Sequence, residues 1–62
     1  ENGYNTLYDK QLRITQQGEF ANGRLFEGKR YTYDANGILT RIQVYKGGRY
    51  AGDAVITDED RQ

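Results

Sequence analysis

The chain has 62 residues, with nine basic and nine acidic side chains that give a formal net charge of zero. It contains no Cys, His, Ser, Met, Trp or Pro, which excludes disulfides, thiolate metal sites and Ser–His or Cys–His nucleophiles. The length allows one small domain, and Leu, Ile, Val and Phe together supply a thin but sufficient core.

Dipeptides that contain glycine divide the chain into extended segments. Their Asn and Gly residues favour the positive φ angles that tight hairpins need, and they occur at Asn2-Gly3, Asn22-Gly23, Asn36-Gly37 and Gly47-Gly48. The segments between them are rich in Tyr, Phe, Ile, Val and Thr, and none has the apolar spacing of a helix. We therefore predict strands at residues 4–8, 12–21, 24–33, 38–46 and 49–57.

Side chains alternate between the two sides of a strand, which assigns them to faces. In the fourth segment alternation places Leu39 and Ile42 on opposite faces, and in the second it places Leu12, Ile14 and Phe20 on the same face. Glycines inside the strands allow a narrow sheet to twist and curl over its core. The predicted fold class is all-β: an antiparallel β-meander of four or five strands, curled or barrel-like.

The sequence resembles itself when it is shifted by about 25 residues, an interval typical of structural repeats. This shift aligns Tyr8 with Tyr33, Asp9 with Asp34, Thr15 with Thr40, Gly23 with Gly48 and Arg24 with Arg49. We predict two hairpin units, at about 8–32 and 33–57, within one domain at 1–57. Residues 58–62 are predicted to be an acidic disordered tail.

The repeated residues carry a resemblance to a known family. The segment from Gly18 to Gly37 contains Gly, an aromatic residue, Asn-Gly, a spacer, Gly and an aromatic strand that ends in Asn-Gly, and a second copy runs from Tyr45 to Asp53. This pattern resembles the variant MORN repeat common in bacteria, over about Leu12 to Asp53. The resemblance implies an antiparallel hairpin array and an antitoxin-like or cell-envelope role. Such repeats usually stack in larger numbers, so we expect that the sheet closes by curling, that it meets another chain at an edge, or that it belongs to a longer array.

Catalytic motifs are not supported by the sequence. The spacing from Gly23 to Lys29 is close to that of a P-loop, but Arg30 stands where a hydroxyl should hold magnesium. Asp9 and Asp34 precede turns, where a carboxylate usually bonds the local backbone. We expect no enzyme activity, no metal site, no cofactor and no small-molecule substrate. No segment is apolar enough to cross a membrane; a bacterial cytoplasm and a cell envelope remain equally open as locations.

The first functional hypothesis is a structural or protein-interaction module, as an accessory part of a larger bacterial assembly or array. The partner, or a second copy, would bind at a tyrosine-rich face or at the edge of the last strand, which could extend a partner's sheet. The residues predicted to bind it are Tyr31, Tyr33, Tyr45, Tyr50, Val55 and Ile56.

The alternative hypothesis is a small β domain that binds single-stranded nucleic acid. Cations interleaved with tyrosines suit phosphates and stacked bases. The candidate cations are Lys29, Arg30, Arg41, Lys46 and Arg49. The zero net charge opposes this hypothesis, because electrostatic attraction dominates such binding.

Overall fold

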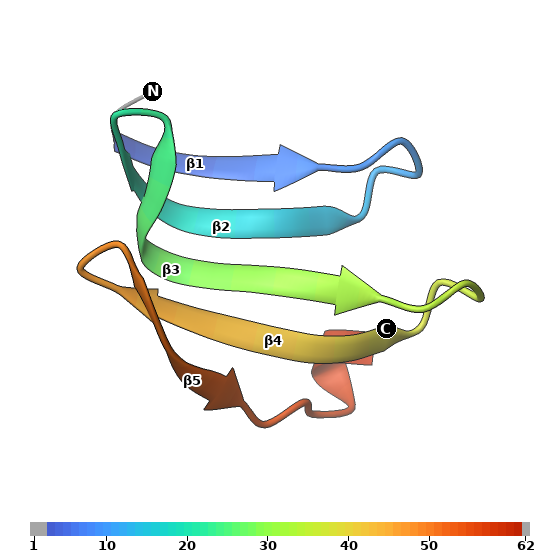
Figure 1. The fold of residues 1–62 in the computed structure, drawn as a ribbon. Helices are drawn as coiled ribbons and strands as arrows, with labels where there is room; N and C mark the ends of the chain where they lie inside the picture. The colour runs from blue at the N-terminus through green and yellow to red at the C-terminus, as the bar shows by residue number, and fades with distance from the viewer. Residues whose placement is uncertain (1–2, 62) are drawn as a thin grey trace.

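A computed structural model describes residues 3–61 and contains a single antiparallel sheet. Its elements are β1 (Gly3–Tyr8), β2 (Ile14–Ala21), β3 (Arg24–Tyr33), β4 (Leu39–Lys46), β5 (Arg49–Ala54) and a 3-10 turn, η1 (Glu59–Arg61). Neighbours in sequence are neighbours in the sheet, with β1 and β5 at its two edges (Figure 1). The predicted all-β meander is confirmed, with five strands. The sheet curls but does not close into a barrel, because β1 and β5 do not pair.

The loops before β2 and β4 are built by the same hydrogen bonds. The Oδ1 atom of Asp9 accepts from the N–H groups two and four residues later, at 2.9 and 3.0 Å. The Oδ1 atom of Asp34 does the same, at 2.9 Å in both cases. Three residues after each Asp the backbone has a positive φ, +64° at Leu12 and +80° at Gly37. The two Asp residues are therefore turn formers, and the pattern recurs at the interval of the sequence repeat.

Two β-bulges also recur at this interval. Thr15 is the extra residue where β1 pairs with β2, and Thr40 is the extra residue where β3 pairs with β4. The hydroxyl of Thr15 donates to the carbonyl of Leu7, and that of Thr40 donates to the carbonyl of Thr32, each at 3.2 Å. Because each bulge adds one residue, the side chains before it in the strand point to the opposite face from the one that simple alternation predicts.

These bulges correct two assignments made from simple alternation. Leu39 lies on the same face as Ile42, because Leu39 is opposite Tyr33 rather than Thr32. Ile14 lies on the face opposite to Phe20, because Ile14 is opposite Tyr8 rather than Leu7. A bulge is decided by pairing between strands, so the pattern within one strand does not predict it.

The core is divided between the two faces of the sheet. Phe20 and Leu25 oppose each other in the β2–β3 hairpin, on one face, and are 7% and 6% exposed. Leu39 and Ile42 lie on the other face and are 3% and 2% exposed. The buried apolar core therefore consists of two small clusters, one on each face of the sheet.

The β2–β3 hairpin bends sharply where two glycines oppose each other (Figure 1). A Cβ atom on Gly28 would lie 2.2 Å from the carbonyl oxygen of Gln17 and 2.8 Å from Cα of Gly18. A Cβ atom on Gly18 would lie 2.2 Å from the carbonyl oxygen of Glu27. The two strands can approach this closely only because neither residue has a side chain.

The last strand is shorter than predicted, because β5 ends at Ala54 and not at Thr57. Beyond it the chain passes behind the sheet as drawn in Figure 1, and the acidic tail contains η1. The carboxylate of Asp60 accepts hydrogen bonds from the N–H and hydroxyl of Thr57, at 2.9 and 3.0 Å. These bonds join polar groups, which a hydropathy pattern does not record, and the prediction of disorder rested on that pattern. Gln62 lies outside the described residues. In residues 3–61 no helix is long and apolar enough to cross a membrane.

Candidate interaction surface

The register of the sheet sorts the predicted binding residues into two faces. Arg30 is opposite Gln43 and Tyr45 is opposite Gly28, which places Arg30 and Tyr45 on the same face. Tyr31 and Tyr33 are opposite Ile42 and Leu39, so both point to the other face. We call the side of Arg30 and Tyr45 the arginine face, and the side of Tyr31 and Tyr33 the tail face. The prediction of one face carrying Tyr31, Tyr33, Tyr45 and Tyr50 is wrong. Tyr45 and its partner Tyr50 lie on the face of Gly28 and Arg30, whereas Tyr31 and Tyr33 alternate with these residues in β3 and point to the opposite face.

On the arginine face, two tyrosines are each paired with an arginine. Tyr45 and Tyr50 oppose each other across β4 and β5, with ring centroids 6.3 Å apart and planes at 65°. The guanidinium of Arg30 lies 5.4 Å from the ring centroid of Tyr45, and that of Arg41 lies 5.5 Å from the ring centroid of Tyr50. These distances are typical of cation–π contacts. The four side chains therefore form a row across three strands.

Asp53 is held at one end of this row. Its carboxylate accepts hydrogen bonds from the Tyr50 hydroxyl at 2.6 Å and from Nε of Arg41 at 2.9 Å, while Nη2 of Arg41 donates to the Tyr50 oxygen at 3.1 Å. The bond from Tyr50, followed by that from Arg41, lowers the pKa of Asp53, and Asp53 raises the pKa of Arg41. Both charged side chains are almost half exposed, so this ion pair orients the residues more than it stabilises the fold.

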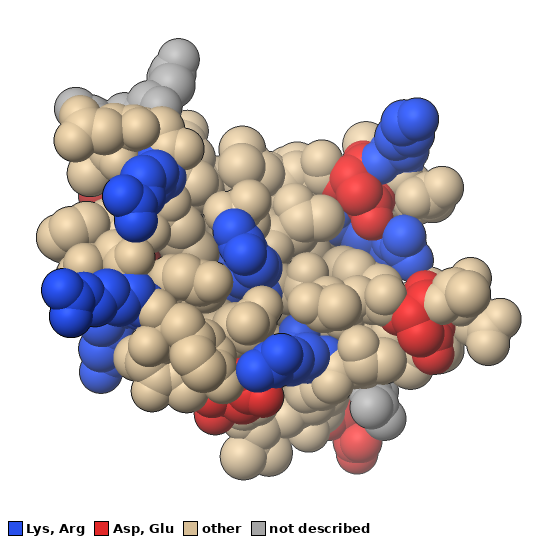
Figure 2. Space-filling view, in the orientation of Figure 1, with Lys and Arg blue, Asp and Glu red and all other residues tan. Residues whose placement is uncertain are grey.

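Next to the row lies a hollow of about 270 Å³ with an apolar floor. Phe20 and Leu25 form its floor, and Arg24, Arg30 and Tyr45 line its rim. Figure 2 shows Lys and Arg side chains spread over the left and centre of this view and also on the loops at the right, where Asp and Glu lie beside them, with further Asp and Glu at the lower edge. The arginine face therefore combines positive charge with a small apolar depression. Arg24 was not among the cations predicted to bind a partner or nucleic acid, although it occupies the position equivalent to Arg49 in the repeat.

The remaining predicted residues lie elsewhere. Lys29 is opposite Val44 and points to the tail face, and Lys46 and Arg49 oppose each other beside the β4–β5 turn. Val55 is 84% exposed and Ile56 is half-buried, but both follow β5 and are not part of a strand. Of the five cations proposed for nucleic acid, the register thus brings only two, Arg30 and Arg41, together on the arginine face.

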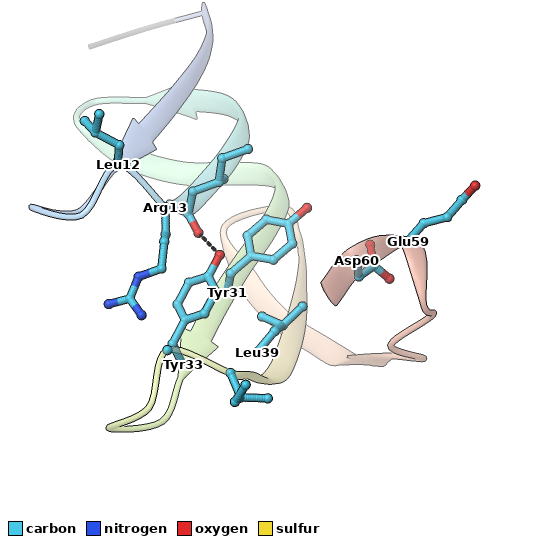
Figure 3. A pocket seen from close by; sticks show the side chains of 10 residues that line it. Leu12, Arg13, Tyr31, Tyr33, Leu39, Glu59 and Asp60 are labelled. Atoms are coloured by element: carbon cyan, nitrogen blue, oxygen red, sulfur yellow. Dashed lines mark hydrogen bonds between the residues drawn. The ribbon is translucent and has the colours of Figure 1, made fainter. Parts of the chain in front are cut away.

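The tail face carries a second, larger pocket of about 510 Å³ (Figure 3). Tyr31 and Tyr33 line it from β3, and Asp60 lines it from η1. The Tyr33 hydroxyl donates to the carbonyl of Ile14 at 2.7 Å, and the guanidinium of Arg13 lies 4.7 Å from the Tyr33 ring centroid. Burial raises the pKa of both tyrosines, and the charge of Asp60 adds to the effect on Tyr31. Tyr33, Arg13 and Asp60 are thus already engaged within the chain.

Across residues 3–61, Asp and Glu side chains do not gather into groups that could hold a metal ion. Comparison of the chain with protein-family models, with curated proteins and with solved structures returns no match.

Proposed function

We propose that the chain is a non-enzymatic protein-interaction module whose arginine face binds an acidic, extended segment of a partner protein. The observation that carries the proposal is that Arg24 and Arg30 line the same hollow as the buried Phe20 and Leu25, beside the row that ends at Arg41. Guanidinium groups suit carboxylates, because their planar donors form paired hydrogen bonds with them. The floor of Phe20 and Leu25 accepts an apolar side chain from the same segment.

Three observations favour a protein partner over single-stranded nucleic acid. A guanidinium already covers one face of the Tyr45 ring and another covers one face of the Tyr50 ring, and each would compete with a stacked base. The two rings are inclined at 65°, so they do not form a common stacking platform. Arg41 is neutralised by Asp53, and the chain as a whole has no net charge to attract a phosphate backbone.

A place in a larger assembly is part of the same proposal. The turns and bulges that recur at the repeat interval support a repeat protein, and the resemblance to the variant MORN repeat adds an expected role as an accessory module. In that role the arginine face would bind one partner while the fold supplies the support.

The test is a binding titration followed by fluorescence anisotropy. The probe is a labelled peptide of alternating Glu and Leu, and the competing probe is an oligothymidylate of equal charge. The R24Q/R30Q variant should bind the peptide about tenfold more weakly, because it loses two exposed ion pairs of up to ~1 kcal/mol each.

Lys29→Gln/Lys46→Gln is the matched control, since it removes the same number of positive charges from residues that do not line the hollow. It should bind the peptide as the unmodified chain does. Absence of peptide binding at low salt, or an equal loss in the control, refutes the proposal. Tighter binding of the oligothymidylate than of the peptide favours the nucleic-acid alternative instead.

A further inference from the structure

The two edges of the sheet differ in how well they are protected against pairing. At the β5 edge, Ala51 is a bulge, Gly52 has a φ of +138°, and Arg49 and Asp53 are charged. Bulges, irregular backbone and charges at an edge are the usual obstacles to strand pairing. Pairing with a further strand is therefore disfavoured at β5.

The β1 edge carries no bulge and no charge of its own, and its one positive φ lies at its first residue, Gly3 (φ +101°). The strand contains no Pro and no charged residue, and it pairs with β2 on one side only. Tyr4, Leu7 and Tyr8 are 64%, 42% and 58% exposed. The extra residue of the nearby bulge belongs to β2, so β1 is regular from Tyr4 to Tyr8. An uncharged, exposed edge of this kind is a template for another strand.

A strand of the same kind elsewhere in the chain is paired on both sides. In the repeat alignment, Gly3 and Tyr8 of β1 correspond to Gly28 and Tyr33 of β3. Within β3, the stretch from Gly28 to Arg30 pairs with β2 on one side and with β4 on the other. Residues 3–5 of β1, which correspond to this stretch, are thus of a backbone type that accepts a neighbour on both sides.

We propose that β1 pairs antiparallel with β1 of a second copy of this chain, with Thr6 opposite Thr6. In this register Tyr4 of each copy is opposite Tyr8 of the other. Both tyrosines point to the tail face, since Tyr4 is opposite Glu19 and the alternation within β1 is unbroken. Two cross-strand aromatic pairs and the backbone hydrogen bonds then join two sheets into one.

The absence of charged residues in β1 favours a second copy of the chain as the partner strand. A two-fold contact brings identical groups together, so any charge near the axis would oppose a like charge. β1 has no charge, and Asp9, which follows it, is already ion-paired with Arg13 at 2.8 Å. An acidic or basic partner would gain no ion pair with β1 itself. The inference does not depend on the arginine face, because the pairing uses the backbone of β1 and tyrosines that point to the tail face, although Leu7 of β1 also lines the hollow.

The contact is short, so the association is weak and depends on concentration. Light scattering on the unmodified chain should show the mass rising towards twice that of one chain as the concentration increases. Hydrogen exchange should show amide protection in β1 rising over the same range, with β5 unchanged. A mass that stays at one chain over the whole range overturns the proposal, and so does protection that rises at β5 instead.

Two charged variants test the register. Tyr4→Lys and Tyr8→Glu should each weaken self-association about tenfold, because each removes both aromatic pairs. A mixture of the two variants should associate more tightly than either alone, since Lys at position 4 of one copy then meets Glu at position 8 of the other. Val55→Lys, a matched change at an exposed apolar residue after β5, should leave self-association unchanged. Failure of the mixture to recover, or an equal effect of Val55→Lys, refutes this register.

Discussion

Replacing Gly28 by Ala tests the close approach of β2 and β3, on which the bend of the sheet depends. The new Cβ atom would lie 2.2 Å from the carbonyl oxygen of Gln17, well inside the 3.0 Å that real Cβ atoms respect. Both atoms belong to, or are fixed by, the backbone, so the strands must move apart. We expect a loss of about 3 kcal/mol, at the upper end of the cost of an overpacked site.

Two further variants separate the contact from the backbone conformation. Gly52 has a φ of +138° but nothing within 4 Å of its Cβ position, so Gly52→Ala carries only the strain of that φ, about 1–2 kcal/mol. Gly18 combines a φ of +148° with a contact at 2.2 Å, so Gly18→Ala should cost about 4–5 kcal/mol. A domain of this size has about 3–9 kcal/mol in total, which places Gly18→Ala near complete unfolding.

Urea unfolding, followed by far-ultraviolet circular dichroism and tyrosine fluorescence, gives the three free energies. At a slope of about 1 kcal/mol per molar urea, Gly28→Ala should lower the midpoint by about 3 M. The expected order of stability is Gly52→Ala, then Gly28→Ala, then Gly18→Ala. If Gly28→Ala is within about 0.5 kcal/mol of the unmodified chain, the strands do not approach as described and the explanation of the bend is refuted.

Two other predictions concern a loop and the arginine face. Leu12 has a φ of +64° and is 80% exposed, so Leu12→Gly should raise the urea midpoint by relieving strain of about 1 kcal/mol; a lower midpoint would show that the Leu12 side chain contributes to stability despite its exposure. The lowered pKa of Asp53 means that its contribution to stability is present above the ordinary Asp pKa and is lost as the pH falls through the lowered value. The Tyr50 ring resonances should therefore shift with Asp53 in an acid titration followed by nuclear magnetic resonance, and Asp53→Asn should abolish that shift; a Tyr50 shift that persists in Asp53→Asn contradicts the network.

The sequence was sufficient for the parts of the fold that depend on local chemistry. Asn22-Gly23 and Gly47-Gly48 form the predicted tight turns, and both middle residues of each have positive φ angles. Hairpin turns and strands depend on residues that are close together in the sequence, so the sequence pattern is enough to predict them. The meander and the five strands follow from them.

The candidate site was harder to predict, because it depends on pairing between strands. Side-chain alternation placed Leu39 and Ile42 on opposite faces, and the bulge at Thr40 reversed this. The division of the tyrosines between two faces follows from the register of β3 against β4, which no single strand encodes. The turn at Asp60 depends on side-chain hydrogen bonds that hydropathy does not record.

The equivalence of the two hairpins gives a reason to assign binding to the arginine face. In the repeat alignment, the opposed pair Phe20 and Leu25 corresponds to the opposed pair Tyr45 and Tyr50. The same backbone, with the same bulge, thus holds a buried apolar pair in one hairpin and a partly exposed pair with hydroxyl groups in the other. Stability alone would favour the apolar pair at both places, because burial of apolar area is the main source of stability in so small a domain. The second hairpin gives up that burial and gains hydroxyl groups and cation–π contacts, which are useful at a surface that binds. The departure of one repeat from the other therefore supports the proposal that the arginine face binds a partner.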